Sequence, residues 1–133
     1  MPGNPYNGFF TPERRATAVA MKRAAARGDL PSANSCCMCR EDRPRYEWHS
    51  EDYRTPFKLY SLCRRCHYAV HIRFSKPAYW LALVRTLDPD GWFQALRLDP
   101  ETLTRPFDLS YPLGLEGARF TLHMGELSSP PRP

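Results

Sequence analysis

The chain has 133 residues, which is enough for one modest domain with a small apolar core. Domains of this size are often stabilised further by a metal ion or a partner. Its formal net charge of +5 and its sequence pI of about 9.1 favour anionic partners such as nucleic acid. No apolar run is long enough to span a membrane and no secretory signal opens the chain, so we expect a cytoplasmic protein without a membrane partner.

Residues 1–10 predict an irregular arm, because prolines and glycines punctuate them. A helix is predicted next, with Thr11 as its N-cap, Pro12 at the first helical position and Gly28 as the stop after about Arg27. This segment is rich in alanine and in basic residues. It is therefore either a helix that contacts phosphates or a solvated basic helix that packs through its small side chains.

Two Cys-x-x-Cys pairs occupy the centre of the chain, Cys36 with Cys39 and Cys63 with Cys66. In a reducing compartment such pairs bind metal more often than they form disulfides. Two pairs complete a tetrahedral four-thiolate Zn²⁺ site, which would be structural because no position is left open. Cys37 has a poorer spacing for chelation and is expected to be a free thiol.

Three histidines lie close to these cysteines. Short strands are predicted over 46–49 and 59–62, and the second cysteine pair opens a helix that carries His67 and His71. Residues four apart share one face of a helix, so these two imidazoles could bind one ion, with His49 approaching from the strand side. The sequence thus allows a second divalent metal site at the three histidines. The alternative is that they are hydrogen-bonded structural residues.

The region 76–127 predicts a mainly helical extension that packs on the domain formed by residues 11–75, and 128–133 predicts a disordered tail. Trp80, Trp92 and Phe93 are expected in the core rather than on a base-stacking surface. The expected elements of the extension are helices over 78–87 and from Asp88-Pro89 through Leu96, a short turn at 99–101, and candidate strands at 107–111 and 119–123.

The basic helix, the strand–loop–strand–helix order and the metal-ligand spacings together predict an α+β fold built on a treble-clef or ββα-metal unit. The pattern resembles the HNH endonuclease superfamily, and in particular its small phage- and mobile-element-borne members. The resemblance covers Thr11 to Phe74. It rests on three segments: Cys36-x2-Cys39, His49-Ser50-Glu51-Asp52-Tyr53-x2-Pro56, and Leu62-Cys63-x2-Cys66-His67-x3-His71.

The resemblance implies that the four-cysteine zinc is structural and that a second metal lies over the scissile phosphate of a nucleic acid. It gives His49, His67 and His71 the metal-site roles and places Ser50 where the family has its water-activating residue. It also places Lys58 where many members have an asparagine. A serine hydroxyl is not basic near neutral pH, so the catalytic set lacks its general base.

Two functions follow from this pattern. The first is a catalytically degenerate module that binds nucleic acid, or a protein through its C-terminal extension. The second is an active metal-dependent endonuclease in which the metal alone, Glu51 or Asp52 activates water. The residues expected to contact nucleic acid are Arg14, Arg15, Lys22, Arg23, Arg64, Arg65 and Arg73.

Overall fold

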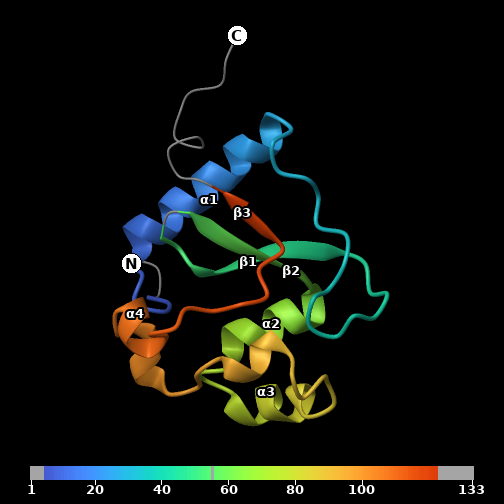
Figure 1. The fold of residues 1–133 in the computed structure, drawn as a ribbon, viewed down its shortest axis with the longest axis vertical. Helices are drawn as coiled ribbons and strands as arrows, with labels where there is room; N and C mark the ends of the chain where they lie inside the picture. Colours follow the sequence, from blue (N-terminus) through green and yellow to red (C-terminus); the bar gives the residue numbers. More distant parts are fainter. Residues whose placement is uncertain (1–4, 55, 123–133) are drawn as a thin grey trace.

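The computed structural model describes residues 5–54 and 56–122, which form an α+β fold with one small antiparallel sheet (Figure 1). The predicted tail at 128–133 lies outside the described residues. In chain order the elements are α1 (Thr11–Ala26), β1 (Tyr46–Asp52), β2 (Phe57–Cys63), α2 (Arg64–Ile72), α3 (Pro77–Val84), the 3₁₀ turns η1 (Trp92–Ala95) and η2 (Pro100–Leu103), α4 (Phe107–Ser110) and β3 (Phe120–Leu122).

The sheet has the order β1-β2-β3, so β1 is an edge strand. β1 and β2 form a hairpin in which Tyr46 pairs with Cys63 and Ser50 pairs with Leu59. The register shifts between Ser50 and Asp52, where β1 has one residue more than its partner. Such bulges redirect side chains and are common beside functional sites.

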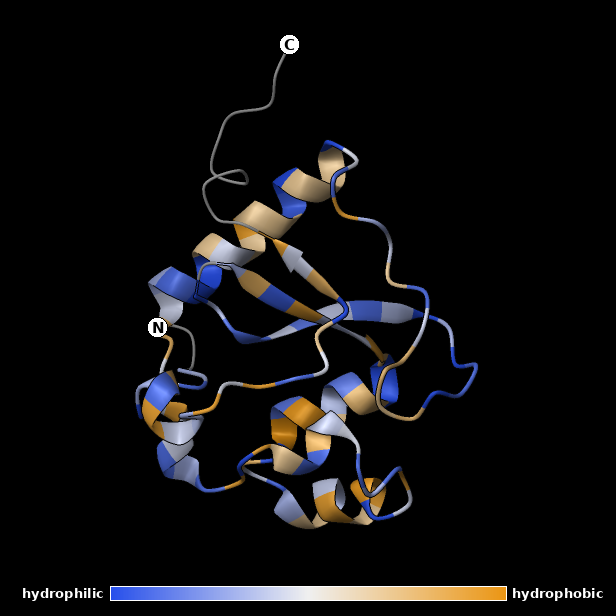
Figure 2. Cartoon of the chain, in the orientation of Figure 1, coloured by the Kyte–Doolittle hydropathy of each residue, from blue (hydrophilic) through white to orange (hydrophobic). Residues whose placement is uncertain are grey.

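Side chains on β2 alternate between two hydrophobic clusters, as the period of a strand requires. Phe57 and Leu59 pack with Ala20 and Ala24 of α1. Tyr60 and Leu62 belong to the cluster that also contains residues of α2 and α3. Figure 1 shows the corresponding arrangement, with α1 on one side of the sheet and α2 and α3 on the other. Figure 2 shows why α1 can lie at the surface: hydrophilic and mildly hydrophobic positions alternate along it.

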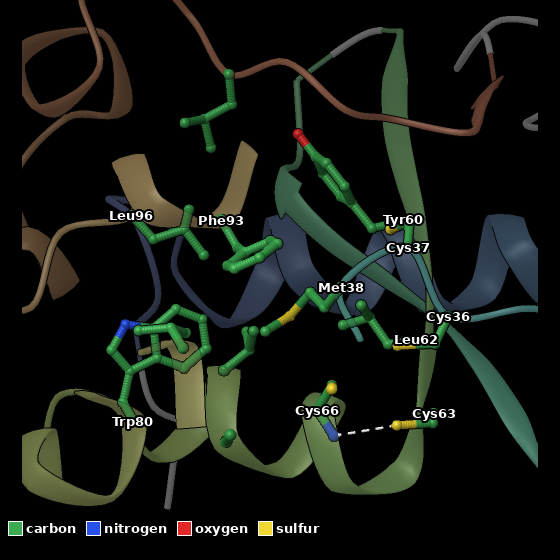
Figure 3. Close-up of a cluster of buried hydrophobic side chains, with 14 of the residues drawn as sticks. Cys36, Cys37, Met38, Tyr60, Leu62, Cys63, Cys66, Trp80, Phe93 and Leu96 are labelled. Atoms are coloured by element: carbon green, nitrogen blue, oxygen red, sulfur yellow. Dashed lines mark hydrogen bonds between the residues drawn. The ribbon is translucent and has the colours of Figure 1, made fainter. Parts of the chain in front are cut away.

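The C-terminal extension completes the second cluster instead of forming a core of its own. Trp80 and Phe93 are buried in it, beside Tyr60 and Leu62 (Figure 3), which confirms that these two aromatic residues belong to the core. Trp92 is half-buried and stacks on Tyr60 with 4.1 Å between ring centroids. Its indole N–H donates to the Cys37 carbonyl over 3.0 Å, so the extension also contacts the first cysteine turn.

The N-terminal arm turns sharply and is tied to the extension. Tyr6 and Phe9 exchange two backbone hydrogen bonds of 2.9 Å, and the Gly8 N–H donates to the Leu103 carbonyl over 3.0 Å. Tyr6, Asn7 and Phe9 are all buried. The described part of the arm therefore belongs to the packed structure.

Three sequence-based predictions of local structure were wrong. The N-cap of α1 is Phe10, not Thr11, because the Glu13 carboxylate accepts from the Phe10 N–H over 3.1 Å. Asp88-Pro89 starts no α-helix, and only the 3₁₀ turn η1 follows it. Residues 107–110 form α4 instead of a strand, because the helical spacing brings the Phe107 and Tyr111 rings to within 5.1 Å, where both pack into the core. Of the candidate strand at 119–123, residues 120–122 are confirmed as β3, and residue 123 is not described.

Within the described part of the chain, no helix combines the length and the apolarity needed to cross a bilayer.

Gly8 and Gly114 offer a test of how closely the arm packs. Both have positive φ angles, +84° and +75°, but a Cβ on Gly8 would lie 2.3 Å from the Arg105 carbonyl oxygen, whereas a Cβ on Gly114 would meet nothing within 4 Å. We expect Gly114→Ala to lower the free energy of unfolding by about 1–2 kcal/mol through backbone strain alone. Gly8→Ala should cost roughly a further 1–3 kcal/mol through overpacking, measured by urea denaturation. Equal costs would contradict the packing of the arm against the extension.

Candidate metal centres

Four cysteine sulfurs converge at the junction of the hairpin and α2. Cys36 and Cys39 lie in a turn before β1, Cys63 ends β2, and Cys66 lies in the first turn of α2. Their sulfur atoms all lie within 4.8 Å of one another. The backbone N–H of Cys66 donates to the Cys63 sulfur over 3.4 Å, as Figure 3 shows. A helix start and a tight turn thus present two sulfurs each to one point.

The protonation of these thiols fits a cation site. A hydrogen bond from Cys66, assisted by nearby backbone N–H groups, lowers the pKa of Cys36 to about 4. The same hydrogen bond raises the pKa of Cys66, and burial raises that of Cys39. Without an ion, four crowded sulfurs cannot all be thiolates. A tetrahedral ion such as Zn²⁺ would relieve this repulsion, and four thiolates form its usual structural ligand set.

Cys37 lies outside this cluster. Its backbone N–H donates to the Ser61 carbonyl over 2.9 Å, and burial raises the pKa of its thiol. It is therefore a matched control for its neighbours in the same turn.

A second convergence involves His49 of β1 with His67 and His71 of α2, whose candidate ligand nitrogens also lie within 4.8 Å of one another. The Nε2 atoms of His67 and His71 are 3.1 Å apart. The His49 ring centroid lies 5.0 Å from that of His67 and 4.8 Å from that of His71. The two helix positions and the strand position therefore meet as their spacing predicted. This geometry suits either one shared ion or an N–H···N hydrogen bond between the helix histidines.

Carboxylates hold the remaining nitrogens of two of these rings. The Glu47 carboxylate lies 2.7 Å from Nδ1 of His67, which leaves Nε2 directed at His71. The Glu51 carboxylate contacts Nε2 of His49, which leaves Nδ1 of that ring available. Carboxylates commonly orient metal-binding histidines in this way. Burial lowers the pKa of His49, so its ring is neutral near pH 7, as a ligand must be. Desolvation and the two neighbouring histidines lower the pKa of His71 to about 3.

Glu51 is completely buried at the centre of a polar network. It accepts hydrogen bonds from the Tyr6 hydroxyl, from Asn7 Nδ2 over 2.7 Å and from Arg73 Nη2 over 3.1 Å. Burial opposes its ionisation, but Arg73 and then His49 outweigh that effect, and the pKa of Glu51 lies well below its usual range. An ionised carboxylate with these partners is a poor proton acceptor. Glu51 is therefore poorly suited to the general-base role suggested from the sequence.

Arg73 corrects another expectation. Its side chain is fully buried and bonded to Glu51, Tyr6 and the carbonyl of Arg97, so it does not face nucleic acid. The hydrophobic surroundings allow this charge to be buried only because Glu51 neutralises it. Asp52 is likewise committed, to Arg54 over 3.0 Å.

The histidines open into a hollow of about 430 Å³ between α1 and the edge strand β1. Arg14, Arg15 and Ser50 line it, and Lys58 does not. Among the other predicted nucleic-acid contacts, Lys22, Arg23 and Arg64 are exposed away from the hollow, and Arg65 lies 3.5 Å from Glu41. Among the described residues the lining contains no carboxylate and consists of Thr11, Arg14, Arg15, Thr17, Ala18, Met21, Trp48, His49, Ser50, Tyr53, His67 and His71.

The sequence analysis missed the residues that support the histidines. Strand alternation places Glu47, His49 and Glu51 on one face, so the sequence held a signal for both carboxylates. No local signal indicates Tyr6 and Asn7, which reach Glu51 from 45 and 44 positions away. Comparisons of the chain with protein-family models, with curated proteins and with solved structures gave no match.

The cysteine cluster predicts a sharp contrast between neighbouring thiols. Cys36→Ser should abolish stoichiometric metal retention and the cooperative thermal transition, because structural zinc contributes folding free energy directly. Cys37→Ser should keep both, since this thiol lies outside the cluster. Metal content by mass spectrometry and circular dichroism melting check the pair. A metal-loaded, cooperatively folded Cys36→Ser chain would contradict the four-cysteine site.

The buried ion pair makes a second prediction. Arg73→Met leaves Glu51 buried without its cation and should lower the free energy of unfolding by about 3–5 kcal/mol. The same change at the exposed Arg43 should have little effect, because its partner Glu41 is solvated. Combining Arg73→Met with Glu51→Gln should recover part of the loss. Urea titration measures the free energy of unfolding of each variant. An equal loss of that free energy in Arg43→Met and Arg73→Met would disprove the stabilising role of the buried pair.

Proposed function

We propose that the chain is an HNH-like treble-clef or ββα-metal module that binds nucleic-acid phosphates through a divalent metal ion and does not cleave them efficiently. The observation that carries this proposal is the convergence of His49, His67 and His71 in a hollow that Arg14 and Arg15 line and to which no described residue contributes a carboxylate. In this proposal the four-cysteine zinc maintains the fold.

The donor set fits a metal that also binds a ligand. Three imidazole ligands leave at least one coordination position of a bound ion open, whereas four cysteines would complete a tetrahedral site. A divalent ion bound there would supply positive charge for a phosphate oxygen. Arg14 is held near the hollow by the rings of Tyr6 and Tyr53, 5.4 Å and 5.8 Å from its guanidinium, and the exposed Arg15 follows it on α1. Two guanidinium groups beside a metal suit a phosphodiester.

The missing group is a proton acceptor. Ser50 lines the hollow, but its hydroxyl is not basic near pH 7, and the two carboxylates suggested from the sequence, Glu51 and Asp52, are committed to Arg73 and Arg54. Loss of a general base typically lowers the rate by about 100- to 10,000-fold. Binding with little cleavage is therefore the function that this site supports best.

An active metal-dependent endonuclease is the second candidate, because the set of three histidines is complete. In that case the metal ion alone would have to make water nucleophilic. The two candidates differ in one measurable quantity, the rate of strand cleavage by the metal-loaded chain.

The decisive variant is Ser50→His. With Mn²⁺ or Mg²⁺, we expect the unmodified chain to bind DNA but nick plasmid at a rate near background. Ser50→His should raise nicking by about 100-fold or more, since it supplies an imidazole base in the hollow.

Two controls accompany this assay. His67→Ala should lose metal-dependent binding in both backgrounds. Arg15→Ala should weaken DNA binding and lower its salt dependence, whereas Lys22→Ala, on the same helix but outside the hollow, should change the metal-dependent component little. Rapid nicking by the unmodified chain that His67→Ala abolishes would favour the endonuclease instead.

A further inference from the structure

We propose that the hollow accepts an unpaired nucleobase beside the metal-held phosphate, so that the ligand is single-stranded nucleic acid. This inference rests on the proposed function, because the metal and the arginines are taken to hold the phosphate. It adds a ligand class that the histidines alone do not specify.

The hollow has a cationic end and an apolar end. Arg14, Ala18 and Met21 follow one another along one face of α1, and all three line the hollow. The rise of an α-helix places Met21 about 10 Å along the axis from Arg14. The imidazoles and guanidinium groups therefore mark one region, and Met21 with Trp48 marks another.

The apolar region has a preorganised aromatic side chain. The Trp48 indole N–H donates to the Pro31 carbonyl over 2.8 Å, and its ring lies 6.1 Å from that of Phe120. Its polar atom is thus already satisfied, and a half-buried ring surface remains for contact with a ligand. The flexible thioether of Met21 can adapt to a flat partner.

A ligand that complements both regions carries an anion and a planar apolar group, separated by about the 10 Å that divides Arg14 from Met21 along the helix. A nucleotide unit of a single strand meets this description, because its base is free to stack on an aromatic side chain. In a duplex the base is paired and stacked, and reaching the hollow would require it to be flipped out. The volume of about 430 Å³ lies in the range of sites for small ligands, so one base with its phosphate is the natural occupant.

The test compares fluorescence anisotropy of three labelled oligonucleotides on the metal-loaded full chain at one salt concentration. These are a single strand, the duplex of the same sequence, and an abasic single strand. We expect the single strand to bind about 10-fold or more tightly than the other two, from the usual strength of base–aromatic stacking. The intact single strand should also quench tryptophan fluorescence more than the abasic strand does, because Trp48 lines the hollow.

Two variants localise the effect. Ala18→Leu fills the hollow from an exposed position of α1 and should remove the preference for an intact single strand. Ala25→Leu, exposed two turns further along the same helix and outside the hollow, should keep it. Zinc content and circular dichroism confirm that both variants fold.

The outcomes separate the two proposals. Equal metal-dependent binding of single strand, abasic strand and duplex overturns the base-binding inference and leaves phosphate binding in place. Preference for an acidic peptide over every oligonucleotide, or no metal-dependent binding of any of them, overturns both.

Discussion

The carboxylate of Glu51 is the point on which the arrangement of this molecule depends. It is completely buried, and such a charge is stable only when paired and hydrogen-bonded. Its partners come from distant parts of the chain: Tyr6 and Asn7 from the arm, His49 from β1, and Arg73 from the end of α2. Because Arg73 also donates to the Arg97 carbonyl over 2.8 Å, the same carboxylate connects the histidine cluster to the C-terminal extension. The need to neutralise one buried carboxylate thus fixes the position of His49, a candidate metal ligand, together with the arm, the end of α2 and the C-terminal extension.

The edge strand β1 explains how two candidate metal-binding clusters fit on so small a sheet. The face that carries Glu47, His49 and Glu51 turns toward α2, and the opposite face carries Trp48 and Ser50 toward α1. No further strand covers the free edge of β1 among the described residues, so His49 from one face and Trp48 and Ser50 from the other all line the hollow. The register shift after Ser50 occurs where the buried carboxylate must be accommodated. The cysteine cluster meanwhile holds the other end of the same hairpin against α2.

The sequence predicted the two clusters well because their information is local. Two Cys-x-x-Cys pairs and a His-x3-His spacing on a helix fix ligand geometry over a few residues. The fate of Arg73 could not be predicted in the same way. A basic residue near a basic helix is normally solvated, and only contacts across 22 and 67 positions, to Glu51 and Tyr6, bury it. The strand expected at 107–111 failed for a related reason, since helical packing of Phe107 and Tyr111 in the core outweighed local preference.

The central claim is that the three imidazoles share one divalent ion. In this account Glu51 and Glu47 each occupy one ring nitrogen of their histidine and leave the other nitrogen to bind the ion. Anomalous diffraction at the cobalt edge, from crystals of the cobalt-loaded chain, tests it most directly. We expect a peak bonded to Nδ1 of His49 and to Nε2 of both His67 and His71, since Glu51 and Glu47 occupy the alternative nitrogens of His49 and His67. Absence of a peak at the histidines, with the four-cysteine site fully loaded, would show that they are structural and would contradict the account.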